Sequence, residues 1–175
     1  GKIIGGGFPV GAFGGRADVM EVLDPTAPGK LRFPHSGTFS ANPITLTAGF
    51  TAMKLYDKKA VNDLNALTQI AKDQINEAIK ITDVPVSLTG SASMFRLHLK
   101  PIGPTSYREA HQTSEERALI VKLLDYLYYE ENIMMINTCA CMFSTVLTQN
   151  EVDRLSDGLF NALKLLRPEI LNLNK

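Results

Sequence analysis

A chain of 175 residues is long enough for one domain, or for one domain with part of another. Apolar residues make up 45 % of it, and its 18 basic residues balance 18 acidic ones, which argues against a surface for nucleic acid or acidic membranes. No apolar run reaches the roughly 18 residues that a membrane span requires, and no signal-peptide pattern follows Gly1. The spacing of Cys139 and Cys141 suits neither a disulfide framework nor a paired zinc knuckle, so we expect a reduced, cytoplasmic protein.

The first part of the chain is rich in glycine and proline, which predicts loops around a short strand near Val10–Phe13 and a short helix near Ala17–Leu23. Residues 43–58 predict a helix that is apolar on several faces and should therefore be buried. The glycine-rich start has no strand or helix cap before it, which suggests a fragment that begins inside a domain.

The remainder predicts a small sheet covered by helices, an α+β plan. Apolar residues at helical spacing predict a helix from Val61 to Ile79. Two strands are expected near Val84–Leu88 and Ser93–Leu99. The second alternates apolar with polar residues, which places His98 on its exposed face.

Two pairs of residues predict helix starts by capping boxes. Thr113 with Glu116 opens a helix that runs to about Tyr129, and Thr148 with Glu151 opens a second one. Between them, the apolar runs Ile133–Ile136 and Met142–Leu147 predict strands. The last helix should end at Pro168 and turn five residues inward: Val152, Leu155, Leu159, Leu163 and Leu166.

The opening run Gly1–Gly7, with the sequence GKIIGGG, carries the most chemical information. Glycines beside Lys2 leave room for a planar ring against the backbone, and a deprotonated lysine amine is a nucleophile. A surface lysine in a turn is the plainer reading of these residues alone. A P-loop would need Ser or Thr where Ile3 stands, and a dinucleotide fingerprint from Gly5 fails at Val10.

Two blocks give the chain a family resemblance. The run GKIIGGGFPVGAFGGR from Gly1 to Arg16 resembles the cofactor-lysine region of class III aminotransferases of the glutamate-1-semialdehyde 2,1-aminomutase type. The resemblance implies that Lys2 is the catalytic residue that binds pyridoxal 5'-phosphate (PLP). His35–Pro43, with the sequence HSGTFSANP, resembles the family's Gly-Thr-x-x-x-Asn-Pro segment. This second resemblance implies a homodimer, in which Gly37 and Thr38 bind the phosphate of the partner subunit's PLP.

The resemblance also implies the fold and the domain organisation. The chain would be the C-terminal portion of an α/β, fold-type-I PLP-dependent transferase. Residues 1–57 would form the end of the PLP-binding large domain with a connecting helix, and residues 58–175 a small C-terminal α+β domain. The phosphate loop, the stacking aromatic ring and the Asp that pairs with the pyridine nitrogen would lie upstream, so the fragment alone is expected to be inactive.

The implied function is PLP-dependent transfer or migration of an amino group on a small amino acid or aldehyde, in tetrapyrrole precursor synthesis if the protein is a true aminomutase. Cys139 stands where the aminomutase carries a glutamate, which puts that substrate in doubt. The alternatives are an aminotransferase acting on another amino acid or ketone, and a catalytically incomplete piece with a structural or dimerisation role.

Other candidate residues have plainer explanations. Cys139 and Cys141 suit core packing better than redox chemistry. We expect no metal site, because the three histidines are scattered along the chain. Arg16 and Arg96 are better read as solvated side chains than as a fork for a substrate carboxylate.

Overall fold

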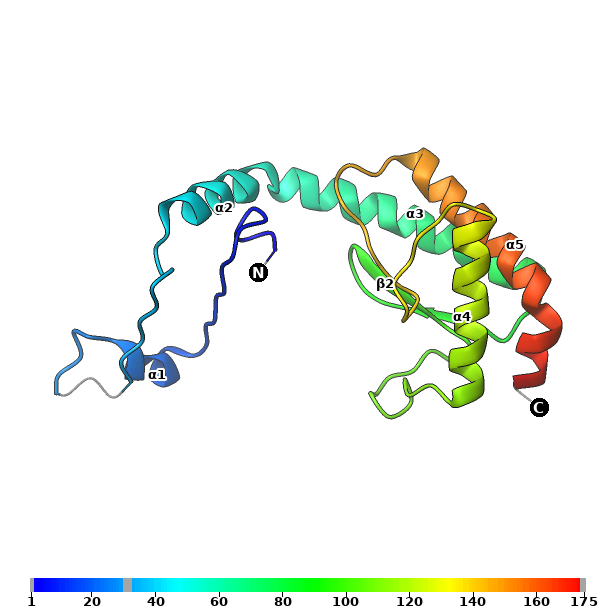
Figure 1. Cartoon of the computed structure of the whole chain (residues 1–175), viewed down its shortest axis with the longest axis horizontal. Helices are drawn as coiled ribbons and strands as arrows, with labels where there is room; N and C mark the ends of the chain where they lie inside the picture. Colours follow the sequence, from blue (N-terminus) through cyan, green and yellow to red (C-terminus); the bar gives the residue numbers. More distant parts are fainter. Residues whose placement is uncertain (1, 30–32, 174–175) are drawn as a thin grey trace. The chain divides into compact units, whose positions relative to one another are not determined.

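A computed structural model describes residues 2–29 and 33–173 of the chain. The residues form two compact units, Gly1–Ala60 and Val61–Lys175, and each is described by itself (Figure 1). The division predicted at residues 57 and 58 concerns the domains of an intact enzyme, and it stays a prediction.

The first unit consists of short helices joined by long loops. Helix α1 (Ala17–Met20) continues into the 3-10 helix η1 (Glu21–Leu23), which confirms the predicted short helix. The strand predicted near Val10–Phe13 is wrong, because these residues are irregular. A strand needs a neighbour to bond its backbone groups, and the described part of this unit contains none.

Helix α2 (Pro43–Leu55) begins at a side-chain cap. The Asn42 Oδ1 accepts hydrogen bonds from the amides of Ile44 and Thr45 at 3.0 and 3.1 Å, and Pro43 occupies the first helical position. Burial of this helix was predicted wrongly for the chain as it stands, because only Thr45 and Gly49 are buried. Its apolar residues point in several directions, and five stay exposed: Ile44, Leu46, Phe50, Met53 and Leu55.

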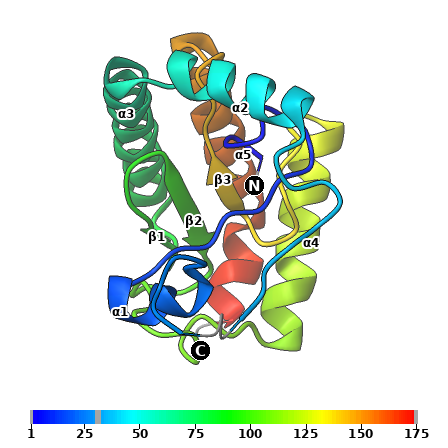
Figure 2. The same ribbon diagram turned by 90° about the vertical axis from the view of Figure 1, so that its left-hand side faces the viewer.

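The second unit contains a three-stranded antiparallel sheet in the order β1-β2-β3. Figure 2 shows the sheet together with α3, and Figure 1 shows α4 and α5 side by side. The elements in chain order are α3 (Lys58–Thr82), β1 (Ser87–Thr89), β2 (Met94–His98), α4 (Ser114–Tyr129), β3 (Ala140–Met142) and α5 (Gln149–Leu173).

One face of the sheet forms the core with the three long helices. Phe95, Leu97 and Leu99 point to this face and are at most 3 % exposed. Buried residues of α3, α4 and α5 join the same cluster, among them Ile75, Leu123, Leu127, Leu159 and Leu163. The helix predicted from Val61 to Ile79 is confirmed as α3, which buries Leu64, Ala71, Ile75 and Ala78. The stripe predicted for α5 is confirmed too, since the five residues expected to face inward are all buried.

The capping box predicted at Thr113 and Glu116 forms in full, and that at Thr148 and Glu151 forms by half. The Thr113 Oγ1 accepts from the Glu116 amide at 3.2 Å, and Glu116 accepts from the Thr113 amide at 2.8 Å. Glu151 likewise accepts from the Thr148 amide at 2.7 Å. The predicted end at Pro168 is wrong, because α5 continues to Leu173. Proline removes one helical hydrogen bond, and Ile170, which is fully buried beyond it, anchors the continuing turn.

Four strands were predicted in the second unit, and three of them form. The strand over Ser93–Leu99 is confirmed as β2, while β1 begins later than predicted. The strand predicted at Ile133–Ile136 is wrong, and that at Met142–Leu147 is displaced to β3. The Ile133 amide donates to the Leu127 carbonyl in the last turn of α4 at 2.8 Å. This amide therefore closes the end of the helix and does not bond to a strand.

Candidate functional site

Lys2 lies at the start of a compact turn that holds the glycine-rich run. The Gly7 amide donates to the Lys2 carbonyl at 3.1 Å, and the Gly6 amide donates to the Ile3 carbonyl at 2.9 Å. The Phe8 amide closes the turn with a bond to the Gly5 carbonyl at 2.9 Å. The Lys2 side chain is exposed, whereas the backbone around it is fixed by these bonds.

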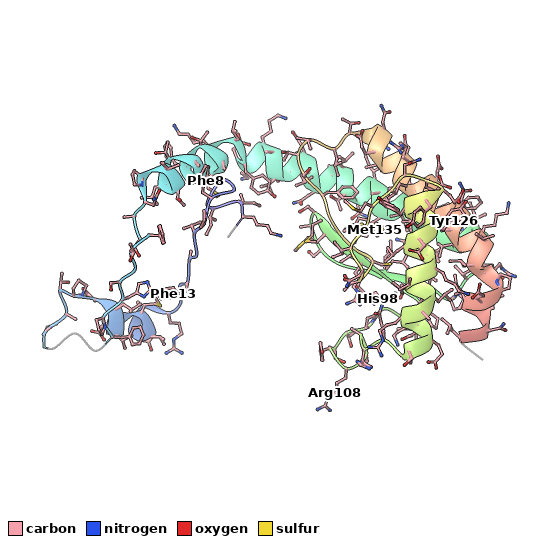
Figure 3. The ribbon with its side chains drawn as sticks, viewed as in Figure 1. Phe8, Phe13, His98, Arg108, Tyr126 and Met135 are labelled. Carbon is pink, nitrogen blue, oxygen red and sulfur yellow. The ribbon has the colours of Figure 1, made fainter. Side chains whose placement is uncertain are left out.

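The turn packs against α2 through glycines on both sides. A Cβ on Gly49 would lie 2.1 Å from the Ile4 carbonyl oxygen, and a Cβ on Gly6 would lie 2.5 Å from the Ala48 carbonyl oxygen. Gly6 also has φ +56°, which favours glycine. Figures 1 and 2 both show the turn (dark blue) against α2 (cyan), and Figure 3 labels Phe8 at its end. Two of the glycines therefore serve helix packing.

Other glycines of the run have no close neighbour within this chain. A Cβ on Gly7 or on Gly11 would meet nothing within 4 Å, so the backbone there has open space beside it. An exposed lysine next to such a stretch fits a ring that binds covalently to its amine.

The second block forms a turn that leads into α2. The Ser40 amide donates to the Gly37 carbonyl at 3.0 Å, and Ala41 takes a φ of +57° before Asn42 caps the helix. The Thr38 side chain is exposed. The Asn-Pro pair that ends this block is a helix-capping signal, and capping as its role was missed at the level of sequence.

Among the described residues, no hydrogen bond joins Lys2 to Gly37 or Thr38. The Lys2 turn contacts the middle of α2, at Ala48 and Gly49, while the Thr38 turn precedes its first residue. The two blocks therefore meet the same helix at different places.

The remaining candidates have structural roles. The guanidinium of Arg16 binds the carboxylate of Asp18, and the Arg96 Nε donates to the Thr138 carbonyl at 3.0 Å. Burial raises the pKa of both Cys139 and Cys141 to about 12, so neither is a ready thiolate. This supports the core-packing interpretation of the cysteines.

His98 is buried, so its prediction as an exposed residue was wrong. Figure 3 labels His98. Its Nε2 lies 2.8 Å from the Thr89 Oγ1 across the β1–β2 pair. Burial lowers the pKa of His98, and the positive charges of Arg96 and Lys100 lower it further. Within residues 2–29 and 33–173, no three metal-binding side chains cluster, and no helix is both long and apolar enough to cross a membrane.

The second unit also has an apolar cavity of about 360 Å³ beside β3. Its lining includes Met135, Cys141, Phe143 and Leu155, with Glu151 and Arg154 as charged members. None of the residues predicted for the cofactor lines it.

Comparison with known proteins identifies the family. The family described as "Aminotransferase class-III" matches residues 1–154. An uncharacterized aminotransferase of Schizosaccharomyces pombe is 35 % identical over 87 % of this chain and 34 % of its own length. A glutamate-1-semialdehyde 2,1-aminomutase of Methanobrevibacter smithii is 33 % identical over 68 % of this chain and 27 % of its own length.

Solved structures similar to this chain are also aminotransferases. An ω-transaminase from Sphaerobacter thermophilus is 38 % identical with a TM-score of 0.87, and it is matched over 95 % of this chain and 38 % of its own. A β-phenylalanine aminotransferase from Variovorax paradoxus is 28 % identical with a TM-score of 0.84, over 96 % and 38 %. The chain therefore belongs to the class III aminotransferase family, and its fold is a part of the fold-type-I transferase architecture, as predicted. It spans about a quarter to a third of the length of the curated relatives it matches.

Proposed function

We propose that this chain carries the cofactor lysine of a PLP-dependent enzyme that transfers or migrates an amino group, and that this lysine is Lys2. The observation that supports the proposal most is the Lys2 turn. It presents an exposed lysine on a backbone fixed by hydrogen bonds, beside glycines with open space, in a chain of this family. One solved relative, 26 % identical, is described as a transaminase with PLP bound.

Each residue has a distinct part in this proposal. The Lys2 Nζ would hold the cofactor covalently and, when free, would accept and return a proton at the substrate Cα. The Thr38 hydroxyl and the Gly37 backbone amide would help to hold the phosphate of the partner subunit's cofactor. PLP itself supplies an electron sink for charge that develops at the substrate Cα.

The dimer follows from the part given to Thr38. If Thr38 serves the other subunit, a two-fold arrangement gives each site the same donor. We propose a homodimer in the cytoplasm that acts on a small amino acid or aldehyde, without nucleic acid or membrane partners.

Within this chemistry, transfer between a separate amino donor and acceptor is favoured over the aminomutase reaction and its tetrapyrrole pathway. Two observations favour it. Cys139, at the position where the aminomutase carries a glutamate, is fully buried with a raised pKa, so it offers no equivalent charge. The two solved structures compared above, with TM-scores of 0.87 and 0.84, are an ω-transaminase and a β-phenylalanine aminotransferase. A catalytically incomplete piece remains the alternative for the 175 residues alone.

The test is borohydride reduction of the PLP-loaded complete polypeptide, followed by mapping of the modified peptide. We expect the adduct on Lys2, and we expect Lys2→Ala to remove both the adduct and the visible absorbance band. Lys54, an exposed lysine of α2 near the Phe50 ring, provides the matched control as Lys54→Ala, which should keep both. An adduct on any other lysine would falsify the assignment.

A further inference from the structure

We infer that Gly49 is a positioning residue for Lys2: the absence of its side chain lets α2 fix the backbone of the lysine turn in the geometry that the cofactor bond needs. This inference rests on the proposed function. It adds a residue 47 positions away in the sequence, on a helix that carries no candidate catalytic group.

The first argument is the closeness of the two backbones. The position of a Cβ on Gly49 is 2.1 Å from the Ile4 carbonyl oxygen and 3.0 Å from its carbon, whereas ordinary contact begins at 3.4 Å. The clash is with backbone, so no side-chain rotation relieves it. Any residue but glycine would push α2 and the turn apart by about 1.3 Å, the gap between 2.1 and 3.4 Å.

The second argument is that the contact is reciprocal. Gly6 faces the same helix, and its Cβ would lie 2.5 and 2.6 Å from the carbonyl oxygen and carbon of Ala48. Thr45 and Gly49, the buried residues of α2, are one helical turn apart and so share one face, and Gly5 is buried as well. The contact is thus built from both elements, and its member Gly49 lies on the one face of α2 that is buried.

The third argument connects this contact to the reacting amine. The Lys2 carbonyl accepts the Gly7 amide, and Ile3 accepts the Gly6 amide, so the residues that touch α2 are bonded to those that carry the lysine. A displacement of Ile4 and Gly6 is therefore transmitted to Lys2. A misplacement of about 1 Å at a reacting group can reduce the rate roughly a hundredfold.

The experiment uses the PLP-loaded complete polypeptide with Gly49→Ala. We expect a folded protein with weaker PLP retention, an altered pH titration of the visible band, and a kcat about a hundredfold lower. An isolated loss of stability would lower only the melting temperature and leave the band and the kcat per folded site unchanged. A folded Gly49→Ala enzyme with the wild-type band titration and kcat would overturn the inference.

Gly158→Ala is the matched control. Gly158 is also a buried glycine inside a helix, α5, but its Cβ would meet the end of a flexible side chain, the Ile133 Cδ1, at 2.7 Å. That methyl group can move away, so the band titration should stay as in the wild type. An equal change in both variants would assign the effect to helix glycines in general and would overturn the inference.

Should Gly49→Ala not fold, amide hydrogen exchange in the wild-type apo form decides. We expect the amides of Gly6, Gly7 and Phe8 to be protected about as well as those of α2, because the turn opens only when it leaves the helix. Fast exchange of these amides beside a protected α2 would overturn the inference. Borohydride mapping in the wild type separates the two claims: an adduct elsewhere than Lys2 defeats the proposed function, whereas an adduct on Lys2 with an unaltered Gly49→Ala enzyme defeats only this inference.

Discussion

Replacing Glu116 by glutamine should separate two interactions that meet at the start of α4. One carboxylate oxygen accepts the Thr113 amide at 2.8 Å, and the other lies 2.9 Å from the Lys100 Nζ. The side-chain oxygen of glutamine can still accept from the Thr113 amide, so the cap is kept, while its NH2 group replaces the oxygen that faces the Lys100 ammonium. Glu116→Gln therefore tests the whole contact with Lys100, the ion pair and its hydrogen bond together, apart from the cap.

The magnitude follows from burial of the pair. The side chains of Lys100 and Glu116 are 28 % and 10 % exposed, so water screens them only in part. A hydrogen bond to a charged group contributes about 1.5–3 kcal/mol, and the exposure of Lys100 places this pair at about 1.5–2 kcal/mol. Glu116→Ala also removes the cap, which should add about 1 kcal/mol.

The assay is urea unfolding of wild type, Glu116→Gln, Lys100→Met and the double variant. A coupling energy above about 0.5 kcal/mol is expected, because the two groups are in direct contact. A loss below about 0.5 kcal/mol in Glu116→Gln, together with zero coupling to Lys100, would refute the reasoning.

Three further outcomes are expected. Burial lowers the pKa of His98, while an unfolded histidine titrates near pH 6.5, so below about pH 6.5 the unfolded state takes up more protons than the native state. The free energy of unfolding should therefore fall as pH falls below about 6.5, and His98→Gln should flatten this slope. An unchanged slope of this variant in urea unfolding would count against the prediction. With thiol pKa values raised to about 12, Cys139 and Cys141 should react slowly with iodoacetamide at about pH 8 in the native state and quickly in urea. Fast native alkylation would contradict the burial of Cys139 and the raised pKa of both thiols. Thr38→Ala should weaken PLP retention roughly ten- to hundredfold in an equilibrium binding measurement, with unchanged circular dichroism, whereas wild-type retention would remove Thr38 from the phosphate site.

The sequence was sufficient where one local signal determines the structure. The stripes of α3 and α5 are one-sided, and a one-sided helix has only one face to bury, so both helices and the five inward residues of α5 were predicted correctly. Capping at Thr113 depends on residues three apart in the chain, and it too was correct. Apolar residues on several faces, as in α2, leave the covered face to be decided by residues distant in the chain.

The errors arose where a partner distant in sequence decides the structure. Ile133–Ile136 has the composition of a strand, but its amide at Ile133 bonds to the end of α4. His98 alternates like an exposed residue, yet Thr89 on the neighbouring strand bonds its ring. The register that places Thr89 there is a property of the β1–β2 pair, which no local pattern in either strand specifies.

The glycines around Lys2 show the same limit at the site itself. At the level of sequence, the functional interpretation of the run Gly5–Gly7 was room for a planar ring, beside the plainer one of a surface turn. The structure separates it into two, because Gly6 packs against the backbone of α2 while Gly7 faces open space. A Cβ at Gly6 would meet the backbone of Ala48, so Gly6→Ala tests helix packing. A Cβ at Gly7 would meet nothing within 4 Å in this chain, so Gly7→Ala tests the clearance beside the lysine. Since both positions have positive φ, alanine strains each of them, and the difference between the two variants, more than either alone, reports which requirement the lysine turn obeys.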